Sequence, residues 1–442
     1  MVKHRHEFRD PIHTFISVNS HERRVVDSLP FQRLRHIQQL ALTNYVYPGA
    51  THKRFEHSLG VMELAGRVFD RITQPDAIHP DVAEVLPELT EKDALPYWRT
   101  TLRMAALCHD IGHLPFSHAA EKDLLPQGKS HEDLTILLIN SAPMRVIFDG
   151  MSPPLKCDLV SKLSVGQNKL KESSFSTWES ILSEIIVGDA FGVDRIDYLL
   201  RDSYHTGVAY GRFDHFRLIE ELRILPASPT GGGESKEPTL GVSYSGIYAA
   251  EALSLARYFI YSQVYLHHVR RIYDIHLIDF MKSWLGTGGY EFNEEFHLSM
   301  TDNEAWSAIL SAARKPEPGS EDARRIVHHQ HFRRVYDASQ ADLASNPDCT
   351  KVIFRAVADK FGSENVRMDQ YIGKSGWTDF PVIRDDKSVE SSMSNSTVLR
   401  NIPSTKLGSV YVDITLREKV KIWLNDNKND VLSANTTEGE RR

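Results

Sequence analysis

The pair His109-Asp110 has clear chemical potential because it ends an apolar segment, RTTLRMAALC (99–108). Burying an imidazole beside a carboxylate is costly unless the two are paired or bind a metal ion. An isolated His-Asp pair at a helix end more often satisfies nearby backbone groups. Here, however, His57 and Asp194 each begin another segment with helical periodicity, which favours a metal site.

These four side chains would form a mixed nitrogen and oxygen ligand set, while their spacing alone leaves their convergence open. Such a set suits Mn²⁺, Fe²⁺, Zn²⁺, Ni²⁺ or Mg²⁺ and leaves positions for water and a phosphate oxygen. Metal-bound water is a nucleophile at neutral pH, and the same ion neutralises phosphate charge. A metal site formed by His57, His109, Asp110 and Asp194 is therefore a hypothesis at this point, and its chemistry would suit the hydrolysis of a phosphate compound.

The segments that must position these residues are predicted to be helices. HSLGVMELAGRVFDRI (57–72) repeats apolar residues at helical spacing. Ser176 is a favourable N-cap, and Gly188 a favourable stop, for the helix between them. The helices predicted in the first 285 residues are 21–42, 57–72, 99–110, 176–188, 193–204 and a long run from 246 to about 285.

The chain changes character after about residue 285. A loop rich in Gly, Pro and Ser (226–239) is flanked by LRIL and TLGVSY, which predict a small β-hairpin before that point. Thr301 and Glu304 form a capping-box pattern ahead of a further helix. Later segments predict strands at FPVIRD, STVLRNI and SVYVDI, a closing helix at LREKVKIWLNDN and a frayed tail. We therefore expect a mainly α protein: residues 1–285 all-helical with a β-hairpin insertion, and residues 286–442 an α+β region for oligomerisation or regulation.

The bulk properties limit the classes of function. The 442 residues carry a net charge of −7, which disfavours general nucleic-acid binding without excluding it. Three scattered cysteines indicate neither a disulfide framework nor a zinc knuckle. The first residues lack the apolar core of a signal peptide, and no stretch approaches the roughly 18 apolar residues of a membrane span. We expect a cytoplasmic protein that does not enter membranes.

Three motifs around the predicted ligands resemble the HD-domain superfamily, and within it the deoxynucleoside triphosphate (dNTP) triphosphohydrolases. The similarity is dense from about residue 9 to 140, returns at 188–212 and is weak afterwards. It implies an all-helical HD domain that cleaves a dNTP at the α-phosphorus into deoxynucleoside and triphosphate. The segments that carry it are RFEHSLGV (54–61), CHDIGHLPFSH (108–118) and GVDRIDYLLRD (192–202), with DPIH (10–13), FQRLRHIQQL (31–40) and YVYPGATHKRFEH (45–57) upstream.

Acid–base residues are expected next to the metal. His118 and Glu121 are three residues apart and would share a helix face. A carboxylate that orients an imidazole and raises its pKa makes a good proton donor, so His118 is expected to protonate the leaving 5′ oxygen. A surface His–Glu pair is the plainer alternative. His113 and His131 are further candidates near the phosphates, although His113 could equally be a packed core histidine.

Other residues are expected to bind the substrate. The resemblance implies that Arg54 and Arg195 contact phosphates and that Tyr198 and Asp202 sense the sugar. A positively charged helix at VYLHHVRRIYDIH (264–276) offers cations for a triphosphate, although an exposed basic face is an equal alternative. The full predicted substrate-binding set is Arg54, Gln39, Leu40, Arg195, Tyr198, Asp202, His267 and Arg271.

Regulation is expected from the same resemblance. Asp27, Gln32 and Arg35 match positions that read an activating guanine nucleotide in the family, which implies activation by GTP or a dNTP and assembly into a dimer or tetramer. Ordinary exposed polar residues are an equal alternative. The physiological role would be control of dNTP pools or their depletion in antiviral defence.

Two other functions are open. One is an HD phosphatase or phosphodiesterase acting on another nucleotide, against which the Tyr198 and Asp202 pair argues. The other is a nucleotide-sensing or nucleic-acid-binding protein with a structural metal site, against which the complete ligand set argues.

Overall fold

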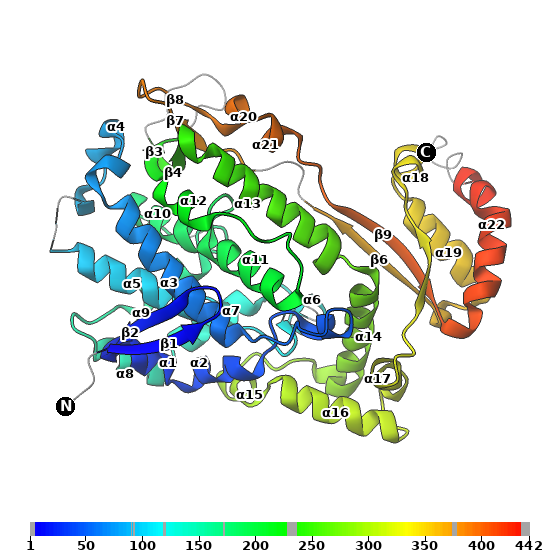
Figure 1. Ribbon diagram of the computed structural model, residues 1–442. Coiled ribbons are helices and arrows are strands. Elements are labelled where there is room, and N and C mark those ends of the chain that lie inside the picture. Colours follow the sequence, from blue (N-terminus) through cyan, green and yellow to red (C-terminus); the bar gives the residue numbers. More distant parts are fainter. Residues whose placement is uncertain are drawn as a thin grey trace. The chain divides into compact units, whose positions relative to one another are not determined.

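The computed structural model describes residues 5–89, 91, 93–117, 121–170, 173–227, 237–373 and 378–434. These residues are mainly helical with small sheets, which confirms the predicted fold class (Figure 1). The chain crosses between two compact units several times, whereas the sequence predicted a single boundary at residue 285. The first unit consists of Met1–Ile260, Gly288–Ala305 and Gly376–Ile402, and the second of Tyr261–Thr287, Trp306–Ser375 and Pro403–Arg442.

The core of the first unit is a cluster of helices that surrounds the predicted ligands. Helix α3 packs against α5 and α11, while α10 packs against α9 and α11. Their inward faces are rich in buried Leu, Ile and Val side chains, as the apolar periodicity predicted. The five helices are α3 (Arg54–Ile72), α5 (Leu95–Cys108), α9 (Cys157–Val165), α10 (Thr177–Val187) and α11 (Val193–Thr206).

The ends of these helices follow the capping signals in the sequence. Ser176 accepts a hydrogen bond from the amide of Glu179 and begins α10, which ends at Gly188. Helix α5 stops with His109 as its C-cap, so the His-Asp pair leaves a buried helix end as predicted. Helix α11 begins directly after Gly192 and therefore carries Asp194 in its first turn.

The helix predicted over residues 21–42 is instead broken into short pieces. Helix α1 (Ser20–Val26) ends at Asp27, and α2 (Leu29–Arg33) follows with Pro30 in its first turn. Proline lacks the amide hydrogen that a continuing helix would need, so the chain restarts there. The prediction of one continuous helix was wrong.

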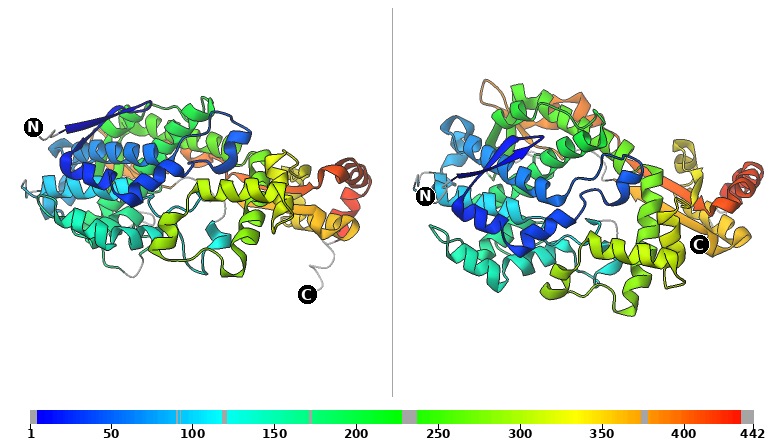
Figure 2. Two further views of the ribbon diagram at one scale, coloured as in Figure 1. Left: turned by 90° about the horizontal axis from the view of Figure 1, so that it is seen from below. Right: turned by 60° about the horizontal axis from the view of Figure 1, so that its bottom comes forward.

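A β-hairpin near the N-terminus was not predicted (Figure 2). Strand β1 (Arg5–Asp10) pairs antiparallel with β2 (Thr14–Asn19), and Asp10 closes the turn by accepting the amide of His13. Strand β1 is largely polar, so it lacks the alternation of apolar and polar residues that marks a strand in sequence.

The predicted hairpin around residue 230 forms and acquires two further strands. Strands β3 (Leu222–Pro226) and β4 (Pro238–Ser243) pair antiparallel, which confirms the hairpin. Strand β4 also pairs in parallel with β7 (Pro381–Ile383), which pairs with β8 (Val389–Ser391). The segment FPVIRD is thus a strand as predicted, but it belongs to the first unit rather than to the C-terminal region.

The segment STVLRNI was predicted to be a strand and is instead helix α21 (Thr397–Asn401). Ser396 caps the helix by accepting the amide of Leu399, and its hydroxyl also contacts Glu251. The cap provides a helical alternative that outweighs the β-branched residues at the start of the segment.

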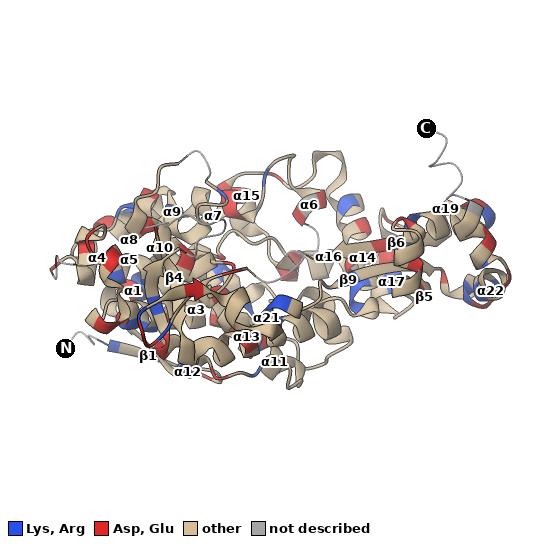
Figure 3. Cartoon of the chain, turned by 90° about the horizontal axis from the view of Figure 1, so that it is seen from above, with Lys and Arg blue, Asp and Glu red and all other residues tan. Residues whose placement is uncertain are grey.

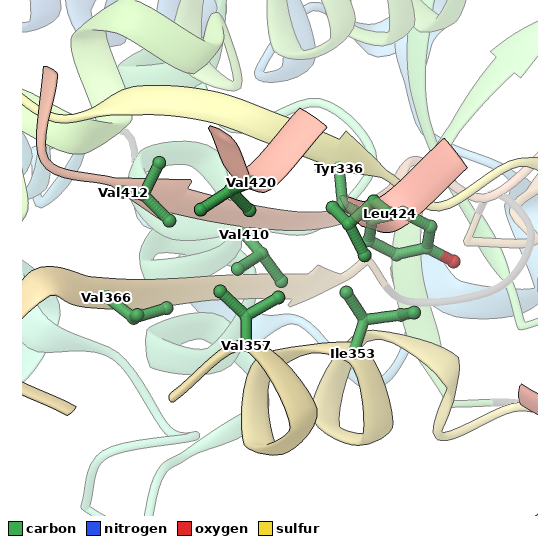
Figure 4. Packing of buried hydrophobic residues seen from close by; sticks show 8 residues of the cluster. All are labelled: Tyr336, Ile353, Val357, Val366, Val410, Val412, Val420 and Leu424. Carbon is green, nitrogen blue, oxygen red and sulfur yellow. The ribbon is translucent and has the colours of Figure 1, made fainter. Parts of the chain in front are cut away.

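The second unit contains a three-stranded sheet covered by two helices. Its strands are ordered β5-β9-β6 and are all antiparallel. Buried side chains from the sheet and from both helices form one apolar cluster (Figure 4). The strand at SVYVDI and the closing helix are therefore confirmed. The elements are β5 (Arg333–Asp337), β6 (Val366–Ile372), β9 (Lys406–Val412), α19 (Cys349–Phe361) and α22 (Arg417–Ala434).

The long helical run begins with α13 (Ile247–Ile260) and continues as α14 (His268–Leu285) in the second unit. Helix α16 (Asp302–Arg314) starts directly after Thr301, whose amide donates to Glu304 in the first turn, as the predicted capping box requires. Among the described residues, no helix is both long and apolar enough to cross a membrane.

Candidate active site

The four predicted metal ligands converge within the first unit. The Nε2 atom of His57 lies 3.0 Å from Asp194 Oδ1 and 3.5 Å from Asp110 Oδ2. The Nε2 atom of His109 lies 3.5 Å from Asp194 Oδ1 and 3.3 Å from Asp110 Oδ1. Their helices therefore bring together four donor side chains from segments far apart in the sequence.

The two imidazoles are oriented with Nε2 toward this centre. The Nδ1 of His57 donates to Asp197 at 2.8 Å, and the Nδ1 of His109 donates to the carbonyl of Ala106 at 2.8 Å. These bonds favour the tautomer whose Nε2 lone pair can bind a metal. The buried Nε2 of His109 has no hydrogen-bond partner among the described residues. A buried nitrogen in that state, facing carboxylates, fits a divalent metal ion.

Asp197 supports the centre from behind and was missed by the sequence analysis. Its fully buried carboxylate accepts from His57, from His13 Nε2 at 2.7 Å and from Arg201 Nε at 2.8 Å. Burial alone would raise the pKa of Asp197, but Arg201 and the two histidines lower it well below its ordinary value. Its position three residues after Asp194 was the available signal.

A second cluster of acid–base side chains adjoins the first. His113 Nε2 lies 3.1 Å from Asp110 Oδ1, and its ring stacks on that of His131 at 3.9 Å. His131 Nδ1 in turn donates to Glu121 at 2.8 Å. Burial opposes protonation of His131, but Glu121 raises its pKa. Three predicted catalytic residues are thus brought together, while His118 lies outside the described residues.

Arg54 enters the same site from the start of α3. It is almost fully buried, contacts Asp110 and donates through Nε to the hydroxyl of Ser117 at 2.7 Å. Burial would raise the pKa of Asp110, yet Arg54 and the imidazoles of His109 and His113 hold it well below its ordinary value. The carboxylate therefore stays ionised and able to bind a cation.

Asp202, a predicted sugar contact, has a partner that the sequence did not indicate. Its buried carboxylate is bonded to His52 Nε2 at 2.7 Å, and His205 stacks on His52 with ring centroids 4.4 Å apart. Tyr198 lies half-buried one helical turn after Asp194. Asp202 is therefore held in a fixed orientation by a second buried residue.

The other predicted contacts in the first unit have mixed surroundings. Leu40 is buried, and the buried Oε1 of Gln39 has no hydrogen-bond partner among the described residues. Arg195 donates to the carbonyl oxygens of Gly188 and Asp189. An unsatisfied amide oxygen such as that of Gln39 is suited to a ligand.

His267 and Arg271 belong to the second unit. His267 caps α14 by accepting the amide of Val269, and Arg271 forms a bidentate pair with Asp369 at 2.6 and 2.7 Å. The same unit holds a cavity of about 350 Å³ whose lining includes the basic side chains His268, His331, Arg333, Arg334, Arg417 and Lys421.

The predicted activator residues lie at or near the surface between α1 and α3. Arg23 pairs with Asp27 at 2.8 Å, and Arg35 Nε donates to Gln32 at 2.9 Å. Arg35 also stacks over the ring of Phe55 at 3.5 Å. Polar side chains and a guanidinium stacked on an aromatic ring thus lie close together at the surface.

Charges of both signs are interspersed over the helices and strands of the described residues (Figure 3). That distribution agrees with the acidic composition.

Comparison with known proteins places the chain in a family. Residues 54–143 match the HD domain and residues 213–368 match the HD associated region. An uncharacterized protein of Methanocaldococcus jannaschii is 37% identical over 60% of this chain and 47% of its own length. The human deoxynucleoside triphosphate triphosphohydrolase SAMHD1 is 30% identical over 74% of this chain and 54% of its own length.

Two solved structures share the architecture. A hypothetical protein from Aquifex aeolicus has a TM-score of 0.76 at 32% identity and covers 95% of this chain and 100% of that one. A phosphohydrolase from Bacteroides thetaiotaomicron has a TM-score of 0.69 at 23% identity, and the match covers 92% of this chain and 99% of that one. At that identity the likeness shows a shared fold and nothing about activity. The chain spans about half the length of the curated relatives it matches first. It belongs to the HD-domain family, as its motifs implied.

Proposed function

We propose that this protein is a metal-dependent hydrolase that converts a dNTP and water into a deoxynucleoside and triphosphate. The observation that carries the proposal is the convergence of His57, His109, Asp110 and Asp194 beside the stacked pair of His113 and His131. The similarity to SAMHD1, whose name states that activity, supports the choice of substrate.

The ligand set would hold a divalent cation, which would supply an activated water and neutralise phosphate charge. The bond between the α-phosphorus and the 5′ oxygen breaks, and the leaving oxygen takes a proton. His118 is our candidate donor of that proton. His131, whose pKa Glu121 raises, is positioned to keep a positive charge beside the phosphates. Arg54 would contact a phosphate.

Sugar selection is assigned to Tyr198 and Asp202. Asp202 is a buried carboxylate held by His52, so it can accept a hydrogen bond from a sugar hydroxyl with little movement of its own side chain. We assign Gln39, Leu40 and Arg195 to neighbouring positions of the nucleotide, and we assign a phosphate-binding role to His267 and Arg271.

Regulation is a further part of the proposal. We infer that Asp27, Gln32 and Arg35 bind an activating GTP or dNTP, supported by the exposed Arg35–Gln32 pair. We also assign an oligomerising or regulatory role to the second unit, whose basic cavity is suited to a polyphosphate. A cytoplasmic homo-oligomer that sets dNTP pools, or depletes them against a virus, is the proposed physiological context.

The test is direct. Purified protein is incubated with each dNTP and NTP, singly and in pairs, with Mg²⁺, Mn²⁺ or Co²⁺, and the products are resolved by chromatography. We expect deoxynucleoside and intact triphosphate from the wild type and from the exposed-site control Asp149→Ala, and none from Asp110→Ala. Activity only with a nucleotide pair would support the activator site.

Other products would move the proposal. Release of monophosphate or inorganic phosphate would indicate an HD phosphatase or phosphodiesterase. Absence of turnover under every mixture, together with nucleotide binding, would favour a sensor and contradict the proposed activity.

A further inference from the structure

Asp302 joins two segments that border the candidate active site. Its side chain is 2% exposed, and its two carboxylate oxygens are divided between two backbone amides. Oδ1 accepts the amide of Phe116 at 2.7 Å, and Oδ2 accepts the amide of Gln38 at 2.7 Å. Both bonds are short and charge-assisted, which makes them stronger than bonds between neutral groups. A single carboxylate therefore fixes the spacing between the two segments.

One of these segments has a strained backbone. Phe116 and Ser117 have φ values of 58° and 60°, in the left-handed region that residues other than glycine seldom adopt. Two such residues in succession persist only where surrounding contacts hold them. Phe116 is fully buried, and the amide bond to Asp302 is one of the contacts that hold its peptide.

The strained turn is bonded to a side chain of the candidate active site. The hydroxyl of Ser117 donates to the carbonyl of Gln38 at 2.7 Å and accepts from Arg54, which contacts Asp110. The turn is thus bonded to Arg54, and Arg54 in turn contacts a proposed metal ligand.

Arg33 reinforces the same junction. Its buried guanidinium donates from Nε to the carbonyl of Met300 at 2.8 Å and from Nη1 to the carbonyl of His113 at 2.8 Å. The segment that contains Asp302, Gly288–Ala305, belongs to the first unit although both flanking stretches belong to the second. The chain thus inserts this segment between active-site loops, rather than leaving it as a linker.

We propose that Asp302 is a positioning residue that holds the strained Phe116–Ser117 turn and, through Ser117, keeps Arg54 in place for the proposed reaction. This inference rests on the proposed function for its catalytic consequence, while the holding of the turn can be measured without it. Asp302 contacts neither the substrate nor the metal ligands in this role. It acts through the two amides.

The experiment compares Asp302→Asn with Glu304→Gln in the full chain. The asparagine keeps the size of the side chain but turns an amide NH₂ toward one of the two backbone N–H groups, so one hydrogen bond is lost. Glu304→Gln is the matched control. Glu304 is an acidic residue of the same helical turn, and its carboxylate accepts the amide of Thr301. Ser117→Ala, which removes the bonds to Gln38 and Arg54, is a second variant should Asp302→Asn fold poorly.

Four quantities are measured for each protein. These are the hydrogen–deuterium exchange of the peptides that contain Phe116 and Gln38, the bound Mn²⁺ per chain, and kcat and KM for dNTP hydrolysis. For Asp302→Asn we expect faster exchange at the amide that loses its hydrogen bond, unchanged Mn²⁺ content, a kcat about 10- to 100-fold lower and a KM within about twofold of the wild type. Ser117→Ala should lower kcat in the same manner, and Glu304→Gln should match the wild type.

Each other result contradicts the inference in a distinct way. Unchanged exchange in Asp302→Asn would show that the carboxylate does not hold the turn. If exchange is faster in Asp302→Asn but its kcat equals that of Glu304→Gln, the turn does not position Arg54 for the reaction. If Asp302→Asn binds less Mn²⁺ and its KM changes together with its kcat, Asp302 has a general structural role instead. If the wild type hydrolyses no nucleotide, the proposed function fails, and the exchange measurement alone still decides whether Asp302 holds the turn.

Discussion

Replacing Gly60 with alanine should damage the support of the metal centre. Gly60 lies on α3, three residues after His57. A Cβ atom at this position would lie 1.9 Å from Asp197 Oδ1 and 2.6 Å from Arg201 Nη2. Neither side chain can retreat easily, because both are buried and each bonds the other. The methyl group must therefore displace Asp197 from His57.

The expected magnitude combines three effects. Overpacking a filled interior costs about 1–3 kcal/mol, and breaking a buried ion pair costs about 3–5 kcal/mol. Alanine regains only about 1 kcal/mol over glycine in helix propensity. We therefore expect Gly60→Ala to lower the free energy of unfolding by about 3–7 kcal/mol. The loss of the carboxylate behind His57 should also weaken Mn²⁺ binding by about 10- to 100-fold.

Gly66 on the same helix provides the control. A Cβ atom there would lie 2.9 Å from Arg103 Nη1 and 3.3 Å from Arg99 Nη2, the far ends of two long side chains. Gly66→Ala should therefore change stability by no more than about 1 kcal/mol. Urea unfolding followed by circular dichroism gives the stabilities, and calorimetric titration gives Mn²⁺ affinity. Wild-type stability and affinity in Gly60→Ala would refute the role assigned to Asp197.

Three other predictions concern stability. Arg201→Lys should lower the free energy of unfolding by about 2–4 kcal/mol, because an ammonium group cannot bond Asp197 and Asp10 in the forked geometry; thermal denaturation would show it, and an unchanged midpoint would contradict it. Ser176→Ala should cost about 1 kcal/mol through the lost cap of α10 and leave Mn²⁺ affinity unaltered; a loss of affinity would mean that the helix end matters to the site. Burial, with nearby positive charge, lowers the pKa of His215 to about 4, so the unfolded chain takes up a proton below about pH 6.5 that the folded chain resists. The free energy of unfolding should therefore fall as the pH is lowered from about 6.5 to about 4, and His215→Phe should make this fall smaller.

Local pattern was enough to predict much of the first unit. Apolar residues at helical spacing predicted α3, α5, α10 and α11, and Ser176 and Gly188 predicted where α10 begins and ends. These features depend on side chains a few residues apart, which a sequence displays directly. The HD motifs added the family, which the comparisons confirm.

Local pattern failed where distant contacts or local caps decided the outcome. The polar strand β1 carries no alternation of apolar residues, and the predicted strand at residues 397–401 becomes a helix through the cap at Ser396. Strand β7 pairs with β4 across a long stretch of sequence, so that segment joined the first unit. Pairing of this kind depends on which surfaces meet, and no spacing encodes it.

The sequence by itself predicted the helices around the candidate site and singled out four side chains as candidate metal ligands, because spacing and residue type are local properties. Only the tertiary structure decided how these residues are supported. Asp197 became the partner of His57 because α3 and α11 approach closely at Gly60. Asp302 reaches the amides of Phe116 and Gln38 from 186 and 264 residues away in the chain. A buried carboxylate must be neutralised by whatever donors the fold places around it, and those donors exist as a set only once the chain has folded.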